Sequence, residues 1–301
     1  MKKYYTVYYF IFLFGLAISL LFETSCRKIE GGQTIPSYLK IDSIFINTYY
    51  PNEGSASQEI TDAWVYVDDQ LLGVFELPAL FPVLSDGNHR LEIRPGIKLN
   101  GISSTRVPYP FYQPIIFENF NFVPDSVMNM GAVSTKYYDN LMFAWLEDFE
   151  EPSISIITSE SSDTSITRTS PENSPEAFLT ENSSYSGKIV LTDANPMFWG
   201  YSFNAFNLPH NETPVALEVN FKTNNSIVVG VLTSLPGDYK WDDLVYLNHS
   251  DEWNKIYINI GPTASRYPNA IDYKIYFRVT KEPDLDTATI FLDNIKLIYR
   301  Q

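Results

Sequence analysis

Few side chains in this sequence are of the types that carry out metal-dependent or nucleophilic catalysis. The 301 residues include three histidines, His89, His210 and His249, and a single cysteine, Cys26. No histidine belongs to a metal-ligand spacing such as His-Glu-x-x-His, and neither a P-loop nor a Gly-x-Ser-x-Gly elbow is present. Carboxylates are numerous, but sequence alone cannot place two of them at the separation a glycosidase needs. The sequence therefore predicts a protein that is not an enzyme, with a degenerate hydrolase as the least favoured alternative.

Composition and charge are typical of a folded, β-rich chain. Hydrophobic residues make up 45% of the sequence, aromatic residues 15% and charged residues 19%. β-Branched and aromatic side chains suit a pleated, half-buried surface, whereas disordered chains have few aromatic and many charged residues. The net charge of −15 repels phosphate backbones and anionic lipid headgroups. Nucleic-acid binding is therefore not expected.

The first 25 residues have the pattern of an export signal. Lys2 and Lys3 form a short positive region, and residues 7–22 are a continuous apolar run of 16 residues. This run is shorter than the roughly 20 residues that a membrane-spanning helix needs. The letters ETS follow, and then Cys26, which as the sole cysteine cannot form an internal disulfide.

This segment resembles the signal of a bacterial lipoprotein. The resemblance implies that residues 1–25 are removed, that Cys26 is diacylated and becomes the mature N-terminus, and that residues 26–37 are a flexible tether. Because Arg27 is not the Asp of inner-membrane retention, the expected location is the outer membrane of a Gram-negative envelope, held by the lipid anchor. An ordinary signal peptide and an uncleaved membrane anchor are the alternatives.

Residues 38–139 are predicted to form a first β-sandwich. Residues 63–67 alternate in hydropathy, and an acidic turn at residues 68–70 separates them from a second run at 71–75, which indicates a hairpin. Residues 89–94 read as a half-buried strand. The order VYVDDQLLGVFELP…L.DGNHRLEIRPG resembles a PEGA-type immunoglobulin-like module, which implies an Ig-like β-sandwich without catalytic chemistry.

Residues 98–112 (KLNGISSTRVPYPFY) break this strand pattern. Tyr109, Phe111 and Tyr112 lie among prolines, which disfavour a central strand. These rings either form an exposed contact surface or close the end of the sandwich core, and we prefer the second interpretation.

Residues 140–301 are predicted to form a second β-sandwich. Alternating stretches at 215–221, 255–260 and 274–279 indicate many short strands and no convincing helix. The apolar run 141–149 is a candidate first strand. The Ser/Thr-rich segment 153–175 is therefore interpreted as a long surface loop of this domain rather than an interdomain linker.

The succession resembles the galactose-binding-like jelly roll of carbohydrate-binding modules. The matching pieces are DFEEP, SYSGKIVL, EWNKIYINI and IFLDNIKLIY, the last of which contains Asp293. The resemblance implies a structural Ca²⁺ held by Asp293, Glu150 and main-chain carbonyls near residues 184–187, and oxygen ligands suit this hard cation. The alternative is that Asp293, which shares the parity of apolar residues on its strand, bonds backbone amides. No organic cofactor is expected.

Sugar binding by such a domain would need flat aromatic rings with polar groups nearby. Trp199 and Tyr201 lie in NPMFWGYSF, and Tyr239 and Trp241 lie in LPGDYKWDD. We predict these four residues as ligand-binding. The second pair is the stronger candidate because its loop is polar and rich in turn residues, whereas Trp199 precedes Gly200 and has core packing as its alternative.

The sequence thus predicts an all-β protein with two tandem β-sandwiches, Ig-like and then jelly roll, behind a cleaved lipoprotein signal peptide. The expected function is that of a non-catalytic, lipid-anchored envelope protein whose C-terminal jelly roll binds a glycan or an envelope protein. The alternative is a structural or accessory subunit of an envelope assembly for secretion, adhesion or motility.

Overall fold

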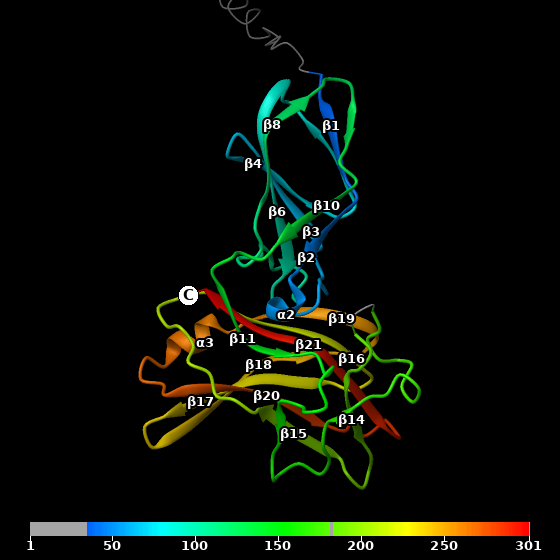
Figure 1. The fold of residues 1–301 in the computed structure, drawn as a ribbon, viewed down its shortest axis with the longest axis vertical. Helices are drawn as coiled ribbons and strands as arrows, with labels where there is room; N and C mark the ends of the chain where they lie inside the picture. The colour runs from blue at the N-terminus through cyan, green and yellow to red at the C-terminus, as the bar shows by residue number, and fades with distance from the viewer. Residues whose placement is uncertain (1–34, 181–182, 301) are drawn as a thin grey trace, which may run out of the picture.

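The computed structural model describes residues 35–180 and 183–300 (Figure 1). The predicted signal peptide, Cys26 and most of the predicted tether lie outside these ranges. Within them, no helix is long and apolar enough to cross a membrane. Strands dominate the described chain, so the predicted all-β fold is confirmed.

From residue 35, where the described chain begins, the N-terminal unit contains ten strands and one short helix. They are β1 (Ser37–Ile41), β2 (Ser43–Asn47), α2 (Tyr50–Glu53), β3 (Asp62–Val67), β4 (Gln70–Glu76), β5 (Ala79–Val83), β6 (Gly87–Lys98), β7 (Arg106–Pro108), β8 (Ile115–Phe122), β9 (Val127–Asn129) and β10 (Ala132–Lys136). One sheet has the order β4-β3-β6-β7, with β8 also paired to β6; the others are β5-β1-β9 and β2-β10. Alternate residues of these sheets, such as Ile41, Val65 and Ile93, share one core. The narrower Ig-like assignment stays a prediction.

The predicted hairpin is present as β3 and β4, which pair in antiparallel register. Asp68 and Asp69 at its turn have φ values of 48° and 64°. A two-residue hairpin whose turn residues both have positive φ matches the right-handed twist of the strands, and aspartate tolerates this conformation. Local sequence was therefore sufficient to define this hairpin.

The described part of the C-terminal unit contains eleven strands and one short helix. They are β11 (Leu141–Glu147), β12 (Ile156–Thr158), β13 (Thr167–Arg168), β14 (Gly187–Leu191), β15 (Met197–Ser202), β16 (Val215–Thr223), β17 (Ile227–Leu235), β18 (Asp238–Leu247), β19 (Ser250–Asn259), α3 (Gly261–Arg266), β20 (Asp272–Thr280) and β21 (Ala288–Arg300). The sheet that we call the junction sheet has the strand order β13-β14-β21-β16-β19, and β11 also pairs with β21. The second sheet, which we call the distal sheet, has the strand order β12-β15-β20-β17-β18.

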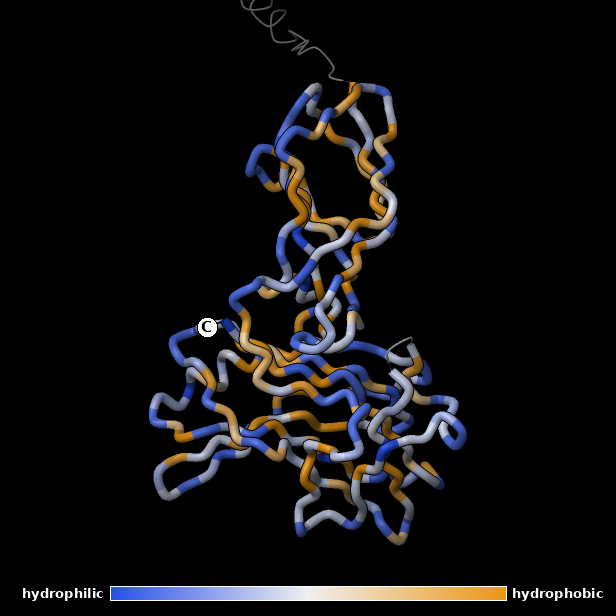
Figure 2. The backbone as a smooth tube through the Cα atoms, viewed as in Figure 1, coloured by the Kyte–Doolittle hydropathy of each residue, from blue (hydrophilic) through white to orange (hydrophobic). Residues whose placement is uncertain are grey.

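The two sheets enclose one apolar core. Leu217 and Val219 of the junction sheet and Val231 and Phe277 of the distal sheet are fully buried in it, each contributing roughly 1.5–3 kcal/mol of hydrophobic stabilisation. Figure 2 shows hydrophobic residues following the strands of both units. Alternation along single strands places these residues inside and leaves polar residues on the outer faces.

Three sequence expectations about this unit can be compared with the structure. Residues 141–147 form β11, which pairs with β21, in agreement with the prediction that the run 141–149 contains the first strand of this unit. Residues 153–175 are not only a loop, because β12 and β13 within them pair with β15 and β14 at the sheet edges. Helix α3 was not foreseen, since its six residues are too few for a recognisable helical period.

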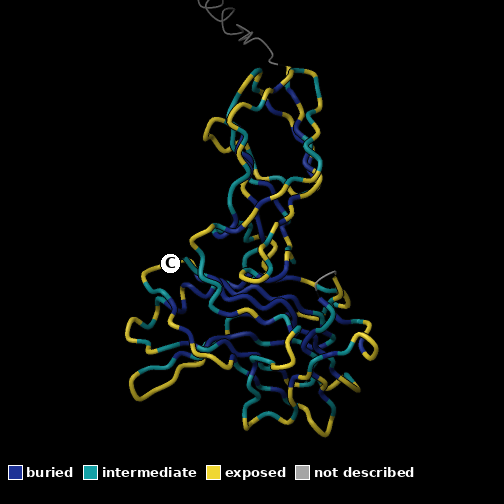
Figure 3. Tube along the Cα trace, in the orientation of Figure 1, coloured by how far each residue is buried: buried dark blue, intermediate teal, exposed yellow. Residues whose placement is uncertain are grey.

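The N-terminal unit sits on the outer face of the junction sheet, whose central strands β16 and β21 are buried on both sides (Figures 1 and 3). Tyr109, Phe111 and Tyr112 are buried at this contact. The Tyr109 ring lies 4.7 Å from that of Tyr257 on β19, and the hydroxyls of Tyr112 and Tyr257 are 3.2 Å apart. The preferred interpretation, that these rings close the end of the core, is confirmed. They also reach the second unit.

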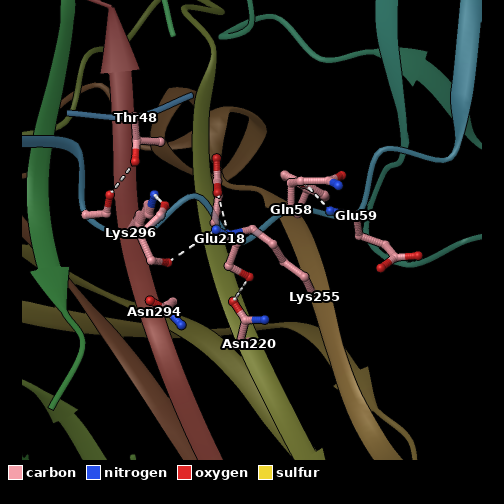
Figure 4. A network of polar contacts seen from close by, with 12 residues as sticks. Thr48, Gln58, Glu59, Glu218, Asn220, Lys255, Asn294 and Lys296 are labelled. Carbon is pink, nitrogen blue, oxygen red and sulfur yellow. Dashed lines mark hydrogen bonds and ion pairs between the residues drawn. The ribbon is translucent and has the colours of Figure 1, made fainter. Parts of the chain in front are cut away.

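A buried charge network crosses the same contact (Figure 4). Glu218 Oε2 lies 2.8 Å from Lys255 Nζ, and Glu218 accepts hydrogen bonds from the hydroxyls of Tyr109 (2.8 Å) and Tyr137 (3.0 Å). Lys296 Nζ donates to the main-chain oxygen of Ser55 over 2.6 Å. Burial acts to raise the pKa of Glu218, but Lys255 and Lys296 outweigh it and hold that pKa below its usual value. The two units are therefore joined by hydrogen bonds to these buried charged groups as well as by rings.

Candidate ligand-binding face

The outer face of the distal sheet is the side of the C-terminal unit not covered by the N-terminal unit. Strand register puts Trp199 opposite Arg278, and Tyr201 opposite Tyr276. Tyr276 lies opposite Gly230 of β17. Trp241 of β18 lies opposite Leu232, which is two residues further along β17 and therefore on the same face. Side chains of equal parity point to one face, so these residues share the outer face.

Three aromatic rings meet on this face. The ring centroids of Trp199 and Trp241 are 4.9 Å apart at an interplanar angle of 68°, and those of Trp241 and Tyr276 are 5.2 Å apart at 66°. Edge-to-face pairs of this kind are worth about 0.5–1.5 kcal/mol each. Trp241 keeps 45% of its surface exposed. We call Trp199, Trp241 and Tyr276 the aromatic platform.

Gly230 makes room for the platform. A Cβ atom at this position would lie 2.2 Å from Cζ of Tyr276 and 2.5 Å from the main-chain oxygen of Asp242. Any side chain larger than hydrogen would displace the Tyr276 ring. The glycine thus lets Tyr276 lie flat across β17 and reach β18.

Polar groups surround the rings. Asp243 accepts hydrogen bonds from the Tyr276 hydroxyl, from Arg278 Nη2 (2.8 Å) and from the Tyr246 hydroxyl (3.2 Å). Burial and the bond to Asp243 raise the pKa of Tyr276 above its ordinary value. The Arg278 guanidinium also lies 5.7 Å from the centre of the Trp199 ring. The face therefore offers a carboxylate acceptor and a guanidinium donor beside the half-exposed ring of Trp241, whereas the Tyr276 ring is fully buried.

The four residues predicted from sequence all lie on this sheet, but they are not equally close. Trp199 and Trp241 are in contact. Tyr201 lies beside them in register with Tyr276, and Lys274 Nζ is 4.9 Å from its ring centre. Tyr239 is 64% exposed near the β17–β18 turn, and within the described chain it has no ring partner. The structure thus brings Trp199 and Trp241 into contact, places Tyr201 opposite Tyr276 in register and leaves Tyr239 at the margin.

Sequence reasoning missed Tyr276, Arg278, Asp243 and the glycine beneath them. A signal was present for two of them, because the alternation over residues 274–279 assigns Tyr276 and Arg278 to the non-core side. Gly230 and Asp243 gave no such signal. Their importance comes from the pairing of β17 with β18 and β20, which local periodicity does not specify.

Glu150 and Asp293, the predicted calcium ligands, both contact the chain near residues 184–187. Glu150 Oε1 accepts the main-chain N–H groups of Ser184 (2.8 Å) and Tyr185 (3.0 Å). Asp293 accepts from the Ser186 hydroxyl (2.6 Å) and from a main-chain N–H (2.6 Å).

The surroundings of Asp293 are compatible with a cation. Burial raises the pKa of Asp293 well above its usual value, and the charges of Asp148 and Glu150 raise it further. Each carboxylate keeps lone pairs for a hard cation. Within the described ranges, no group of three or more His, Cys, Asp or Glu side chains could hold a metal, so any ligation would need main-chain oxygens, and calcium stays a prediction.

No protein-family model and no curated protein matches the sequence. The chain is similar to a carbohydrate-binding module of the β-sandwich superfamily described as promiscuous in specificity, with 13% identity over 78% of this chain and 84% of that one and a TM-score of 0.38. It is also similar to the CBM22-1–GH10 modules of Clostridium thermocellum xylanase 10B in complex with xylohexaose, with 15% identity over 53% of this chain, only 28% of that chain and a TM-score of 0.38. A third is TmCBM61 in complex with β-1,4-galactotriose, with 15% identity over 51% of this chain and 94% of that one and a TM-score of 0.33. With TM-scores below 0.5, these similarities decide neither fold nor function.

Proposed function

We propose that this protein binds a glycan, without catalysis, through the outer face of the distal sheet. The observation that carries the proposal is the aromatic platform, in which Trp241 is half exposed and is held at a fixed angle by Trp199 and Tyr276. A fixed ring presents contact area at low entropic cost. The C–H face of a sugar ring suits such a surface because both are apolar and flat.

The polar groups at the platform suit a neutral, hydroxyl-bearing ligand. Asp243 and Arg278 are each about one-third exposed and already pair with each other over 2.8 Å. Together they offer an acceptor and a donor with no net charge. Hydroxyls can bond both groups at once, whereas an anion would be repelled by Asp243 and a cation would be repelled by Arg278.

The arrangement of the two units supports display of this face. The N-terminal unit covers the outer face of the junction sheet, and the first described residues lie at the end of the molecule away from the distal sheet (Figure 1). A lipid anchor at Cys26 in the outer membrane would thus hold the platform away from the lipid surface. Metabolic labelling with a palmitate analogue tests the anchor. We expect label in the wild type and none in Cys26→Ser, and label that persists in the variant would refute it.

Glycan arrays followed by isothermal titration with the full chain test the binding proposal. Trp241→Ala should weaken binding of any glycan hit by at least about tenfold, since truncating an aromatic residue at the centre of a binding surface costs about 2 kcal/mol or more. Tyr49→Ala is the matched control, because Tyr49 is 65% exposed but lies beside α2. Absence of binding to every glycan, or equal binding by Trp241→Ala, would overturn the proposal.

A subunit role in an envelope assembly is the second candidate, and edge strand β4 favours it. Among the described residues, β4 pairs only with β3, and it exposes Leu71 (50%), Leu72 (40%) and Val74 (39%). An unpaired edge with aliphatic side chains can accept an extended strand of another envelope protein. Leu72→Lys should abolish cross-linking to such a partner in cells while leaving glycan binding intact. If the wild-type protein forms no such cross-link in cells, the role as an assembly subunit would be excluded.

A further inference from the structure

A cavity lies between the two units, away from the aromatic platform. Its volume is about 740 Å³, and it is lined by residues 99 and 107–111 of the N-terminal unit and by residues 212–216, 259, 261–262 and 265–266 of the C-terminal unit. Ligand sites usually measure about 300–1,000 Å³ and favour such domain boundaries. The cavity is therefore large enough for a small organic molecule.

Its walls are apolar and rigid. Four prolines line it, Pro108 and Pro110 from one unit and Pro214 and Pro262 from the other. Proline fixes its own backbone and offers no N–H donor, so these segments present hydrocarbon without unsatisfied amides. Val107 adds a half-buried aliphatic surface. The junction network described above fixes the units relative to each other, so the walls are already in place before a ligand binds.

Two charged side chains line the cavity, and only one has its charge balanced. Arg266 donates to Asp242 Oδ1 over 2.6 Å. Glu212 is exposed, and within the described ranges no cation pairs with it. Its backbone is held against α3, because its main-chain N–H donates to the Ser265 hydroxyl over 3.0 Å. The mouth therefore has one uncompensated negative charge.

We propose that this cavity binds a small organic cation with an apolar, ring-sized body. The body would contact the proline-lined walls, and the cationic group would pair with Glu212. The net charge of −15 favours the approach of a cation over that of an anion. The site is separate from the aromatic platform in residues and in the chemistry of its ligand.

Three naphthalene compounds of one size test this proposal by isothermal titration on the full chain. They are 2-(1-naphthyl)ethylamine, which is a cation, 2-(1-naphthyl)ethanol, which is neutral, and 1-naphthaleneacetate, which is an anion. We expect the amine to bind up to about fivefold tighter than the alcohol, as for a partly exposed ion pair, and the acetate to bind most weakly. This preference should shrink as salt is added.

Variants assign the binding to the cavity. Glu212→Gln should make the amine and the alcohol bind equally, whereas the exposed control Glu172→Gln should leave the preference unchanged. Val107→Trp should weaken both compounds about tenfold or more by filling the space. Trp241→Ala should leave amine binding unchanged, so failure of the glycan proposal does not affect this test. No saturable binding of the amine, or a preference that survives in Glu212→Gln, would overturn the proposal.

Discussion

The Tyr276 ring lies across Gly230, so close that a Cβ at residue 230 would be 2.2 Å from its Cζ atom. This contact lets a ring from β20 span β17 and bond Asp243 on β18. The absence of a Cβ at residue 230 thus allows side chains of β20 and β18 to meet across β17 and form one binding surface.

Gly230→Ala should disrupt that surface. Forcing a methyl group into this contact is expected to destabilise the protein by about 1–3 kcal/mol and to weaken glycan binding by displacing Tyr276. Urea unfolding and titration measure the two effects. The double variant Gly230→Ala/Tyr276→Ala removes the clash with the ring and keeps only the contact with the main-chain oxygen of Asp242. We expect it to be less destabilised than the two single changes added together, and simple additivity would show that the residues are not coupled.

Glu218→Gln should be the most damaging single change at the junction. It would leave the ammonium groups of Lys255 and Lys296 buried near each other without a counter-charge, and loss of one partner from a buried ion pair costs about 3–5 kcal/mol. Glu118→Gln on the exposed side of β8 is the matched control, with an expected change below about 0.5 kcal/mol. Equal unfolding midpoints for the two variants would contradict the network.

Lys296 should make stability depend on pH. Burial, with a contribution from Lys255, lowers the pKa of Lys296 to about 7, whereas an unfolded lysine has a pKa near 10.4. Between these values the unfolded chain binds more protons, so the free energy of unfolding should rise as pH increases from 7 to about 9. Below pH 7 both states are protonated and this dependence ends.

The variant Lys296→Met tests that assignment. It should flatten the rise between pH 7 and 9 in urea unfolding experiments, whereas Lys40→Met, which removes a surface lysine that is 41% exposed, should not. A rise of equal slope in Lys296→Met would assign the pH dependence to other groups.

Calcium should raise the melting temperature if the predicted site exists. A cation that binds only the folded state stabilises it by mass action. We expect the wild type to melt higher in millimolar Ca²⁺ than in chelator, and Asp293→Asn to show no difference because it removes a buried carboxylate ligand. Wild-type melting that does not depend on calcium would refute the site.

Sequence periodicity was sufficient for the local elements of this protein. It identified the β3–β4 hairpin, the β11 strand and the alternating strands that supply the core residues Leu217 and Phe277. These features depend on side chains a few residues apart, and a strand's period of two records them directly. The same period also assigned Tyr276 to the outer face.

Only the tertiary structure determined which parts of the protein pack against those strand faces. Alternation assigned Glu218 to the outer side of its strand, yet Glu218 is fully buried because the N-terminal unit covers that side. Trp199 and Trp241 lie on β15 and β18, with β20 and β17 between them, roughly 14 Å apart across the sheet. Their rings meet across these two strands, and the Tyr276 ring that contacts Trp241 fits because residue 230 is glycine. Such contacts depend on pairings between distant segments, which the local pattern of a single sequence does not contain.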